Sequence, residues 1–285
     1  MDSQPKHQST SGQLFVVATP IGNLADMTYR AVETLKQADI IAAEDTRNSR
    51  KLLQHYGITT AMIAVHEHNE ANMIQTLLPR LQQGENIALI SDAGTPLISD
   101  PGYRLVRGLR AEGIRIVPIP GASSVLTSLC AAGLPTDHFR FTGFLPRSGK
   151  TRQQALNRIN GSDETVVILE SPHRLLSTLR NIQTCMDASR ELVVARELTK
   201  LFEEFVAGSA TELISHFEQH APRGEIVLLI GPATEAAVEL TDQQIIECLA
   251  SPAMQALPPS ARAKAVANML GVAKSRAYAL ITGNN

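Results

Sequence analysis

Residues 87–113 read IALISDAGTPLISDPGYRLVRGLRAEG, and this stretch has the pattern that decides the fold class. The apolar run at 87–91 predicts a buried strand, a loop of glycine, proline and small residues follows, and 103–112 has helical spacing closed by Gly113. Strands and helices that alternate in this way form a mostly parallel α/β sheet. The expected strands of the first half are 14–18, 39–43, 62–65, 87–91 and 114–119. The expected helices are 29–37, 48–55, 70–83, 103–112 and 123–132.

The rhythm changes after residues 133–135, which read GLP. A second strand set is expected at 139–144, 165–170, 191–196, 202–207 and 225–230. The strands 191–196 and 202–207 follow each other too closely for a helix between them, which predicts antiparallel pairing. The chain therefore has a predicted boundary near 120–135. The expected domains are an N-terminal α/β domain at 12–122, a C-terminal α/β domain at 123–235 and a helical hairpin tail at 240–285.

The tail is expected to hold two short helices, 260–270 and 273–281, around a turn at Gly271 and Val272. This arrangement is similar to a helix-turn-helix. Two interpretations stay open, namely that the hairpin binds nucleic acid and that it is a packing or dimer element.

Composition narrows the class of protein. The chain of 285 residues exceeds one typical core, which predicts two domains. No apolar run approaches the roughly 18 residues of a membrane span, and the polar segment 1–13 has no signal-peptide core, so we expect a cytoplasmic protein without a membrane partner. Three widely spaced cysteines predict reduced thiols and no paired-cysteine zinc site. His66 and His68 share a strand face without a third ligand, so no metal is expected.

Basic residues are concentrated in two segments, although the net charge is only −2. Neither 144–158 nor 251–285 contains an acidic residue. Such patches are typical of phosphate binding, and equally of solvated helix surfaces. The predicted RNA-binding residues in them are Arg147, Lys150, Arg152, Arg262, Lys264, Lys274 and Arg276.

Four loops follow predicted strands of the first half, where open α/β sheets bind ligands. The loop 18–24 lacks G-x-G-x-x-G spacing, which disfavours a dinucleotide cofactor. In the loop 91–96, small residues allow a ligand to approach the main chain. The loop 118–124 leads into a helix. Ser123 or Ser124 either caps the start of this helix or lies where its positive end binds a ligand carboxylate. The cluster 44–47, EDTR, is either a reacting group or a capped helix start with a salt bridge.

A set of motifs covers residues 14–231, and the set is specific although each motif alone is weak. They are TPIGNL at 19–24, AEDTR at 43–47, SDAGTP at 91–96 with Ile98, DPG at 100–102, PG at 120–121, GFLP at 143–146, ESPHR at 170–174, ARELTK at 195–200 and GE at 224–225. In this order they resemble the tetrapyrrole methylase superfamily, and more closely its ribosomal RNA small subunit methyltransferase I branch of 2′-O-methyltransferases. The tail hairpin resembles the one seen in this branch.

The resemblance implies two α/β domains, S-adenosylmethionine bound between them, a homodimer, and methylation of a cytidine ribose in the decoding region of 16S rRNA. Whether the 30S subunit is needed stays open. Where corrin-ring methylases have a glycine-rich run, this chain has TPIG at 19–22, and where they have Gly-Asp-Pro, it has GTP at 94–96. These differences favour a methyl acceptor other than a tetrapyrrole. Loop position and the resemblance together predict these cofactor-binding residues: Asp92, Ala93, Gly94, Thr95, Pro96, Ile98, Ser123, Ser124, Glu170, Ser171, Gly224, Glu225, Ile226 and Val227.

Methyl transfer from a sulfonium is an in-line displacement that requires alignment in a dry cleft and no metal. The acceptor hydroxyl must lose a proton, so a nearby carboxylate or amine helps as general base. The predicted catalytic residues are Asp45, Arg47, Glu170, Glu197 and Lys200. Our hypothesis places Asp45 or Arg47 at the acceptor side.

Two alternatives to an RNA methyltransferase stay open for the function of the protein. They are a small-molecule, tetrapyrrole-type methylase and a non-catalytic RNA-binding assembly factor.

Overall fold

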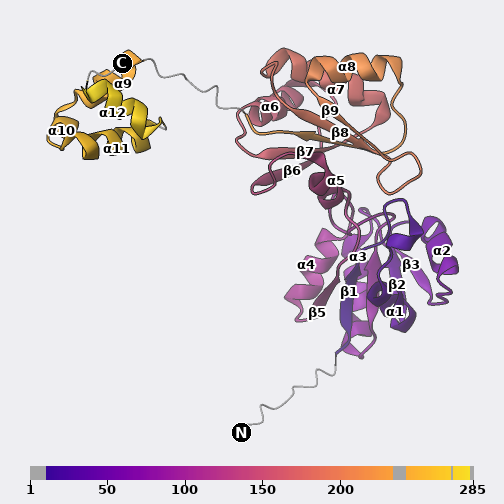
Figure 1. The fold of residues 1–285 in the computed structure, drawn as a ribbon. Helices are drawn as coiled ribbons and strands as arrows, with labels where there is room; N and C mark the ends of the chain where they lie inside the picture. Colours follow the sequence, from indigo (N-terminus) through magenta and orange to yellow (C-terminus); the bar gives the residue numbers. More distant parts are fainter. Residues whose placement is uncertain (1–10, 234–241, 271, 283–285) are drawn as a thin grey trace, which may run out of the picture. The chain divides into compact units, whose positions relative to one another are not determined.

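The computed structural model describes residues 11–233, 242–270 and 272–282. The chain divides into two compact units, Met1–Ala233 and Thr234–Asn285 (Figure 1). The first unit contains two five-stranded sheets, and the second is helical. Of the sequence predictions, Gly271 at the tail turn and the domain limits at 235 and 240 lie outside the described residues.

The first sheet is parallel throughout and has the strand order β3-β2-β4-β1-β5. Its strands are β1 (Gln13–Val17), β2 (Ile40–Ala43), β3 (Met62–Ala64), β4 (Ile87–Ile90) and β5 (Arg115–Ile119). The helices that follow them are α1 (Tyr29–Gln37), α2 (Thr46–His55), α3 (Glu70–Gln82), α4 (Tyr103–Ala111) and α5 (Ser124–Ala132), with a short 3-10 helix η1 (Leu24–Asp26) after β1. The prediction of five βα units is confirmed.

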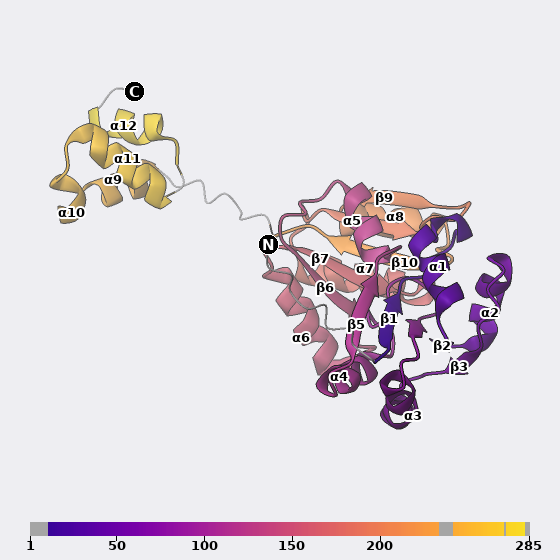
Figure 2. The ribbon, with the colours of Figure 1, turned by 90° about the horizontal axis from the view of Figure 1, so that it is seen from below.

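Both faces of this sheet are covered, which explains why its strands β2 and β4 are apolar at every position. Helices α1 and α2 pack on one face through Leu35 and Leu53. Helices α3 and α4 lie side by side on the other face and pack through Leu77 and Leu105 (Figure 2). The carboxyl ends of β1, β2 and β4 therefore meet at one edge, where the loops of the predicted site begin.

The second sheet is mixed, with the order β6-β7-β10-β8-β9. Its strands are β6 (Phe139–Phe144), β7 (Thr165–Glu170), β8 (Leu192–Arg196), β9 (Glu204–Gly208) and β10 (Ile226–Ile230). The predicted antiparallel pairing of β8 with β9 is confirmed. Strand β9 begins two residues later than expected, because Leu201 and Phe202, apolar residues typical of a strand, lie exposed in the turn before it.

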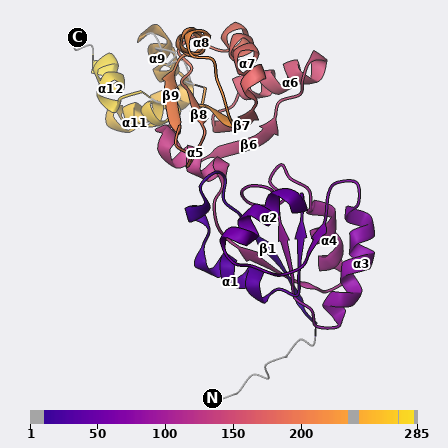
Figure 3. The same cartoon turned by 90° about the vertical axis from the view of Figure 1, so that its right-hand side faces the viewer.

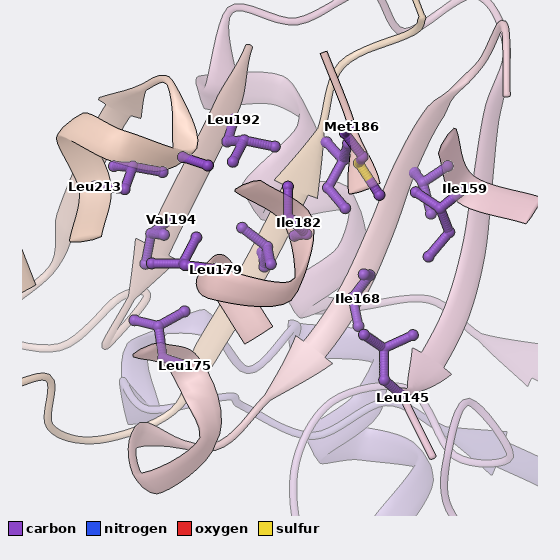
Figure 4. Packing of buried hydrophobic residues seen from close by; sticks show 14 of the residues in the cluster. Leu145, Ile159, Ile168, Leu175, Leu179, Ile182, Met186, Leu192, Val194 and Leu213 are labelled. Atoms are coloured by element: carbon purple, nitrogen blue, oxygen red, sulfur yellow. The ribbon is translucent and has the colours of Figure 1, made fainter. Parts of the chain in front are cut away.

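Helices that the sequence analysis did not assign cover one face of the second sheet. They are α6 (Gly149–Asn160), α7 (Pro172–Cys185) and α8 (Ala210–Gln219). Figure 4 shows Leu175, Leu179 and Ile182 of α7 packed towards Ile168 and Val194 of the strands. Helix α5 covers the other face, on the side of the first sheet (Figure 3).

One apolar cluster joins the two halves of the first unit. Ile21, from the loop after β1, packs with Val125 of α5 and with Val227 of β10. The loop of the first sheet is thus part of the core under the second sheet, and the space beside it lies between the two halves.

The second unit has its own small core. Its described helices are α9 (Asp242–Leu249), α10 (Pro252–Gln255), α11 (Pro259–Leu270) and α12 (Lys274–Thr282), and Ile245, Val266 and Ala277 are fully buried among them. The two predicted tail helices correspond to α11 and α12. Within the described part of the chain, no helix is long and apolar enough to cross a membrane.

Candidate functional site

A cavity of about 370 Å³ lies between the two halves of the first unit. Its wall comes from the loop after β4, the start of α5, the end of β7 and the start of β10. The lining residues are Ile21, Ala93, Ile98, Ser99, Asp100, Ser124, Phe144, Leu169, Glu170, Ser171, Pro172, Leu198, Gly224, Glu225, Ile226 and Val227. We call this space the first cavity.

Two loops with strained backbone form opposite parts of its rim. Leu97 and Ser99 have φ of 74° and 68°, and Glu197 and Thr199 have φ of 51° and 65°. In each loop the residue between the two strained positions, Ile98 or Leu198, lines the first cavity. Non-glycine residues in this region cost free energy and persist where packing over-determines them, commonly at ligand sites.

The predicted cofactor-binding residues divide between the first cavity and its border. Those that line it are Ala93, Ile98, Ser124, Glu170, Ser171, Gly224, Glu225, Ile226 and Val227. Gly94, Thr95 and Ser123 line a small pocket of about 30 Å³ that shares Ala93 and Ile98 with it. Asp92 and Pro96 line neither of these two pockets, and Pro96 is buried.

Gly94 has a structural role in its loop. Its N–H donates to Thr19 O at 3.0 Å, and its carbonyl accepts from Thr19 N at 2.9 Å. Its φ is +77°, and a Cβ there would lie 3.2 Å from Ile21 Cγ2. Gly94 therefore shapes the loop that presents Ala93, and a substitution at Gly94 would disturb the fold as well as a ligand.

Glu170 is buried and its carboxylate is fully engaged. It accepts from Ser171 N at 2.8 Å and from Thr178 Oγ1 at 2.6 Å, and Arg174 Nε lies 3.4 Å away. Its side chain has no exposed surface. These contacts tie the Glu170 carboxylate to the start of α7 at the cavity.

Glu197 and Lys200 form an ion pair at the rim. Lys200 Nζ lies 2.9 Å from Glu197 Oε1 and 3.2 Å from Glu225 Oε2. The bond from Lys200 lowers the pKa of Glu197. Burial works to lower the pKa of Lys200, but the two carboxylates outweigh it and the pKa is raised. Neither group is therefore suited to accept a proton at neutral pH.

Asp45 caps helix α2, and its carboxylate accepts from Arg47 N at 2.8 Å. The Arg47 guanidinium also donates to both Asp45 oxygens, at 3.1 and 2.8 Å, and these bonds lower the Asp45 pKa to about 2. The Arg47 side chain is 86% exposed. Neither residue lines the first cavity. The structure corresponds to the capped helix start with a salt bridge that the sequence left open.

Glu44, next to Asp45, and Asp100 have the properties expected of a proton acceptor. Burial, reinforced by neighbouring carboxylates, raises the pKa of Glu44. Burial is also the main cause that raises the pKa of Asp100, and Asp92 adds to it. Asp100 lines the first cavity, and both residues line a second cavity beside it. Sequence reasoning missed them as site residues, although both lie within the quoted motifs AEDTR and DPG.

Further residues that line the first cavity were not predicted from the sequence. Ile21, Phe144 and Leu198 line the first cavity and belong to the motifs TPIGNL, GFLP and ARELTK. Ser99, Leu169 and Pro172 also line it, and each stands next to a residue that was predicted, namely Ile98, Glu170 or Ser171.

The predicted RNA-binding residues are of two kinds. Arg152 is 7% exposed and bonds Asn181 Oδ1, Pro146 O and Thr178 Oγ1 at 3.0, 3.0 and 2.8 Å, so we remove it from the proposed set. Arg147 and Lys150 are exposed beside it.

In the tail, Arg276 pairs with Asp242 at 2.7 Å, and Arg262 donates to Gln255 O and Leu257 O, both at 3.1 Å. These two arginines hold the helices of the second unit together. Lys264 and Lys274 are exposed.

Comparison with known proteins bears on this site. Residues 13–214 match the family model of the Tetrapyrrole (Corrin/Porphyrin) Methylases. A Synechocystis protein named Ribosomal RNA small subunit methyltransferase I is 51% identical over 223 residues, which cover 78% of this chain and 80% of that protein. A Haemophilus influenzae protein of the same name is 44% identical over 274 residues, 94% of this chain and 95% of that one.

Among solved structures, uroporphyrin-III C-methyl transferase from Thermus thermophilus, complexed with S-adenosyl homocysteine, has a TM-score of 0.55 at 18% identity. The match covers 77% of this chain and 97% of that one, and it shows a common fold.

Proposed function

The chain belongs to the tetrapyrrole methylase family, and on that premise we propose that it transfers a methyl group from S-adenosylmethionine to the ribose 2′-oxygen of a cytidine in the decoding region of 16S rRNA. The single observation that supports the RNA substrate is the 44% identity, over 94% of the chain, to a relative whose name states ribosomal RNA small subunit methyltransferase I. This similarity extends over both sheets and the tail.

The first cavity suits S-adenosylmethionine by its size and by the chemistry of its wall. A volume of about 370 Å³ is in the range of small-molecule sites. Apolar Leu169 and Val227 offer a surface to a purine, and Ser171, whose hydroxyl caps no helix amide, offers a hydrogen bond. The carboxyl groups of Asp100 and Glu225 favour a cationic ligand. When bound, the cofactor supplies an electrophilic methyl group on a positively charged sulfur.

The residues of this chain then have three tasks. They hold the acceptor in line with the methyl group, they exclude water, and they accept the proton that the hydroxyl loses. Glu170, Glu197 and Lys200 are engaged in bonds within the protein and serve the first two tasks. We therefore assign the third task, the acceptance of the hydroxyl proton, to Glu44 or Asp100, which line the cavities, in place of Asp45 and Arg47.

A corrinoid acceptor is the second candidate, and the exposed basic residues speak against it. Arg147 and Lys150 lie on the surface at the start of α6, where a phosphate chain has access. A neutral or polyanionic small molecule needs a closed pocket and not an extended cationic surface.

The test is a methyl-transfer assay with radiolabelled S-adenosylmethionine that offers naked 16S rRNA, 30S subunits and uroporphyrinogen III side by side. We expect label in RNA only, and digestion followed by mass spectrometry should find it as a 2′-O-methylated cytidine. Label in the porphyrinogen, or in a nucleobase, would overturn the proposal. RNA binding without any transfer would favour the assembly factor.

We also propose that the protein is a cytoplasmic homodimer. Leu126, Phe139 and Phe202 of the first unit are large apolar residues that are 59%, 41% and 67% exposed, and a subunit interface would remove such side chains from water. Light scattering behind size exclusion should give twice the chain mass of 30.8 kDa. A mass of one chain at micromolar concentration would contradict it.

A further inference from the structure

A second cavity of about 570 Å³ lies at the carboxyl edge of the first sheet. It is bounded by the end of β2, the loop after β3, and the segment from the β4 loop into α4. The lining residues are Glu44, His66, Glu67, His68, Glu70, Ser99, Asp100, Pro101, Tyr103 and Arg104. This edge is where ligands bind in open parallel sheets.

The second cavity adjoins the first at two shared residues. Ser99 and Asp100 line both cavities. Ser99 belongs to the strained loop at the rim, with φ of 68°. A ligand in the second cavity would therefore meet one in the first cavity at the Asp100 carboxyl group.

The wall of the second cavity is acidic, but its carboxyl groups have different roles. Glu70 is engaged with the start of α4, because it accepts from Gly102 N at 2.9 Å and from Arg104 N at 2.8 Å. Glu44 accepts one bond, from Asp92 N at 3.4 Å, and Asp100 is bonded by the Ser91 side chain, so each keeps further acceptor capacity. Glu67 and two exposed histidines complete this part of the wall. The described residues include no cluster of three or more His, Cys, Asp or Glu that could hold a metal ion.

Carboxylates repel a phosphate but accept hydrogen bonds from hydroxyl and amino groups. A ribose offers hydroxyls, and the cytosine amino group is a donor that Glu or Asp recognises. The acidic wall thus suits the nucleoside part of a nucleotide and not its phosphate.

Two residues at the start of α4 complete the recognition. Tyr103 is 61% exposed although it lines the cavity, so its ring has a free face for a base. Arg104 is exposed one residue further on and has no ion-pair partner among the described residues. An aromatic ring next to a guanidinium matches a base next to its phosphate.

We propose that the second cavity holds the acceptor nucleoside of the RNA, with the base against Tyr103, the adjoining phosphate at Arg104 and the ribose hydroxyl at Asp100. This inference rests on the proposed function. A nucleotide whose base lies against Tyr103 inside this cavity is out of a base pair, so the acceptor must be unpaired when it binds.

The binding test uses the protein saturated with S-adenosylhomocysteine and a fluorescent RNA hairpin that carries the decoding-region cytidine in its loop. Tyr103→Ala should weaken binding on the order of ten-fold, the size of one base-stacking contact, with an unchanged salt slope. Tyr103→Phe should bind as the wild type does. Tyr29→Ala, at a residue 94% exposed on α1, is the matched control and should change nothing.

Arg104→Gln should weaken RNA binding. It should also reduce the slope of log binding constant against log salt concentration by about one, the contribution of one phosphate contact. Arg107→Gln, one turn further along α4 and also exposed, is its control. Asp100→Asn should bind RNA normally and lower kcat. Normal RNA affinity of Tyr103→Ala, or equal effects of Arg104→Gln and Arg107→Gln, would place the acceptor elsewhere.

The wild-type protein separates failure of this subsite from failure of the proposed function. If the wild type methylates RNA while the variants at Tyr103 and Arg104 match it in KM and affinity, only the subsite is wrong. If the wild type transfers no methyl group to any form of ribosomal RNA, the function is wrong and the subsite falls with it.

Discussion

The side chain of Lys200 lies directly against Gly22, so that a Cβ on Gly22 would be 2.5 Å from Lys200 Cγ and 2.8 Å from Lys200 Cε. Gly22 belongs to the loop after β1, and Lys200 to the loop after β8. The contact joins the two halves of the first unit next to the first cavity. Through its ion pairs with Glu197 and Glu225, Lys200 also holds two segments of that cavity's wall.

Gly22→Ala should weaken binding of S-adenosylhomocysteine, because the new methyl group displaces Lys200 and with it the loop that presents Leu198. Calorimetry measures the affinity. The double variant Gly22→Ala with Lys200→Ala should recover part of the loss, since the displaced atoms are gone. Equal affinity of Gly22→Ala and wild type would show that this contact does not shape the cofactor site.

Ala93→Leu should abolish detectable cofactor binding, because an exposed small residue at the wall of the first cavity would be replaced by a branched side chain that takes up part of the space the cofactor needs. Ala131→Leu, an exposed position on α5 outside both cavities, is the matched control and should bind normally. Calorimetry with S-adenosylhomocysteine measures both. Binding by Ala93→Leu at wild-type affinity would place the cofactor elsewhere.

Asp100→Asn should lower kcat by about 100-fold or more, the size of a general-base effect, and raise Tm at neutral pH. Burial raises the folded pKa of Asp100 above its unfolded value of 3.8, so the folded state pays for ionisation above the folded pKa. The Tm difference should therefore be present at neutral pH and shrink as the pH falls through the folded pKa.

Differential scanning calorimetry from pH 4 to 8 measures this difference. A lower Tm of Asp100→Asn than of the wild type at neutral pH would mean that the Asp100 carboxylate stabilises the fold. That result would contradict the proposal that Asp100 is kept for proton acceptance at a cost in stability.

Glu44→Gln and Asp45→Asn form a matched pair at adjacent positions. Glu44 lines the second cavity, so Glu44→Gln should lower kcat/KM for RNA several-fold. Asparagine replaces aspartate well as a helix cap, so Asp45→Asn should lose only the exposed pair with Arg47 and keep its activity. Steady-state kinetics decide between them, and the reverse ranking would restore Asp45 to the acceptor side.

Lys264→Gln with Lys274→Gln should weaken RNA binding and flatten its salt dependence while the tail stays folded, because neither lysine forms an ion pair among the described residues. Arg276→Gln instead removes the pair with Asp242 and should lower the stability of the second unit. Anisotropy at several salt concentrations and circular dichroism measure the two effects. An unchanged salt slope for the lysine variant would make the tail a structural or dimer element.

The sequence by itself determined the strands, the helices of the first sheet and the class of protein, whereas helices α6, α7 and α8 were not predicted. Apolar runs such as 87–90 predict strands whatever surrounds them, because a strand buried on both faces must be apolar throughout. The motifs at the strand ends identified the family for the same local reason, since rigid loops of glycine and proline lie within short segments of sequence. The ligand site that they predict stays a prediction.

Only the tertiary structure decided which polar groups of those motifs are free to react. Arg152 is engaged because partners 26 and 29 positions away, Thr178 and Asn181, lie within bonding distance. Asp100 and Glu44, 56 positions apart in the numbering, come together because β2 and β4 are neighbours in the sheet. Burial and pairing depend on contacts between distant segments, so the residue type and its local pattern do not determine whether a carboxylate supports the fold or faces a substrate.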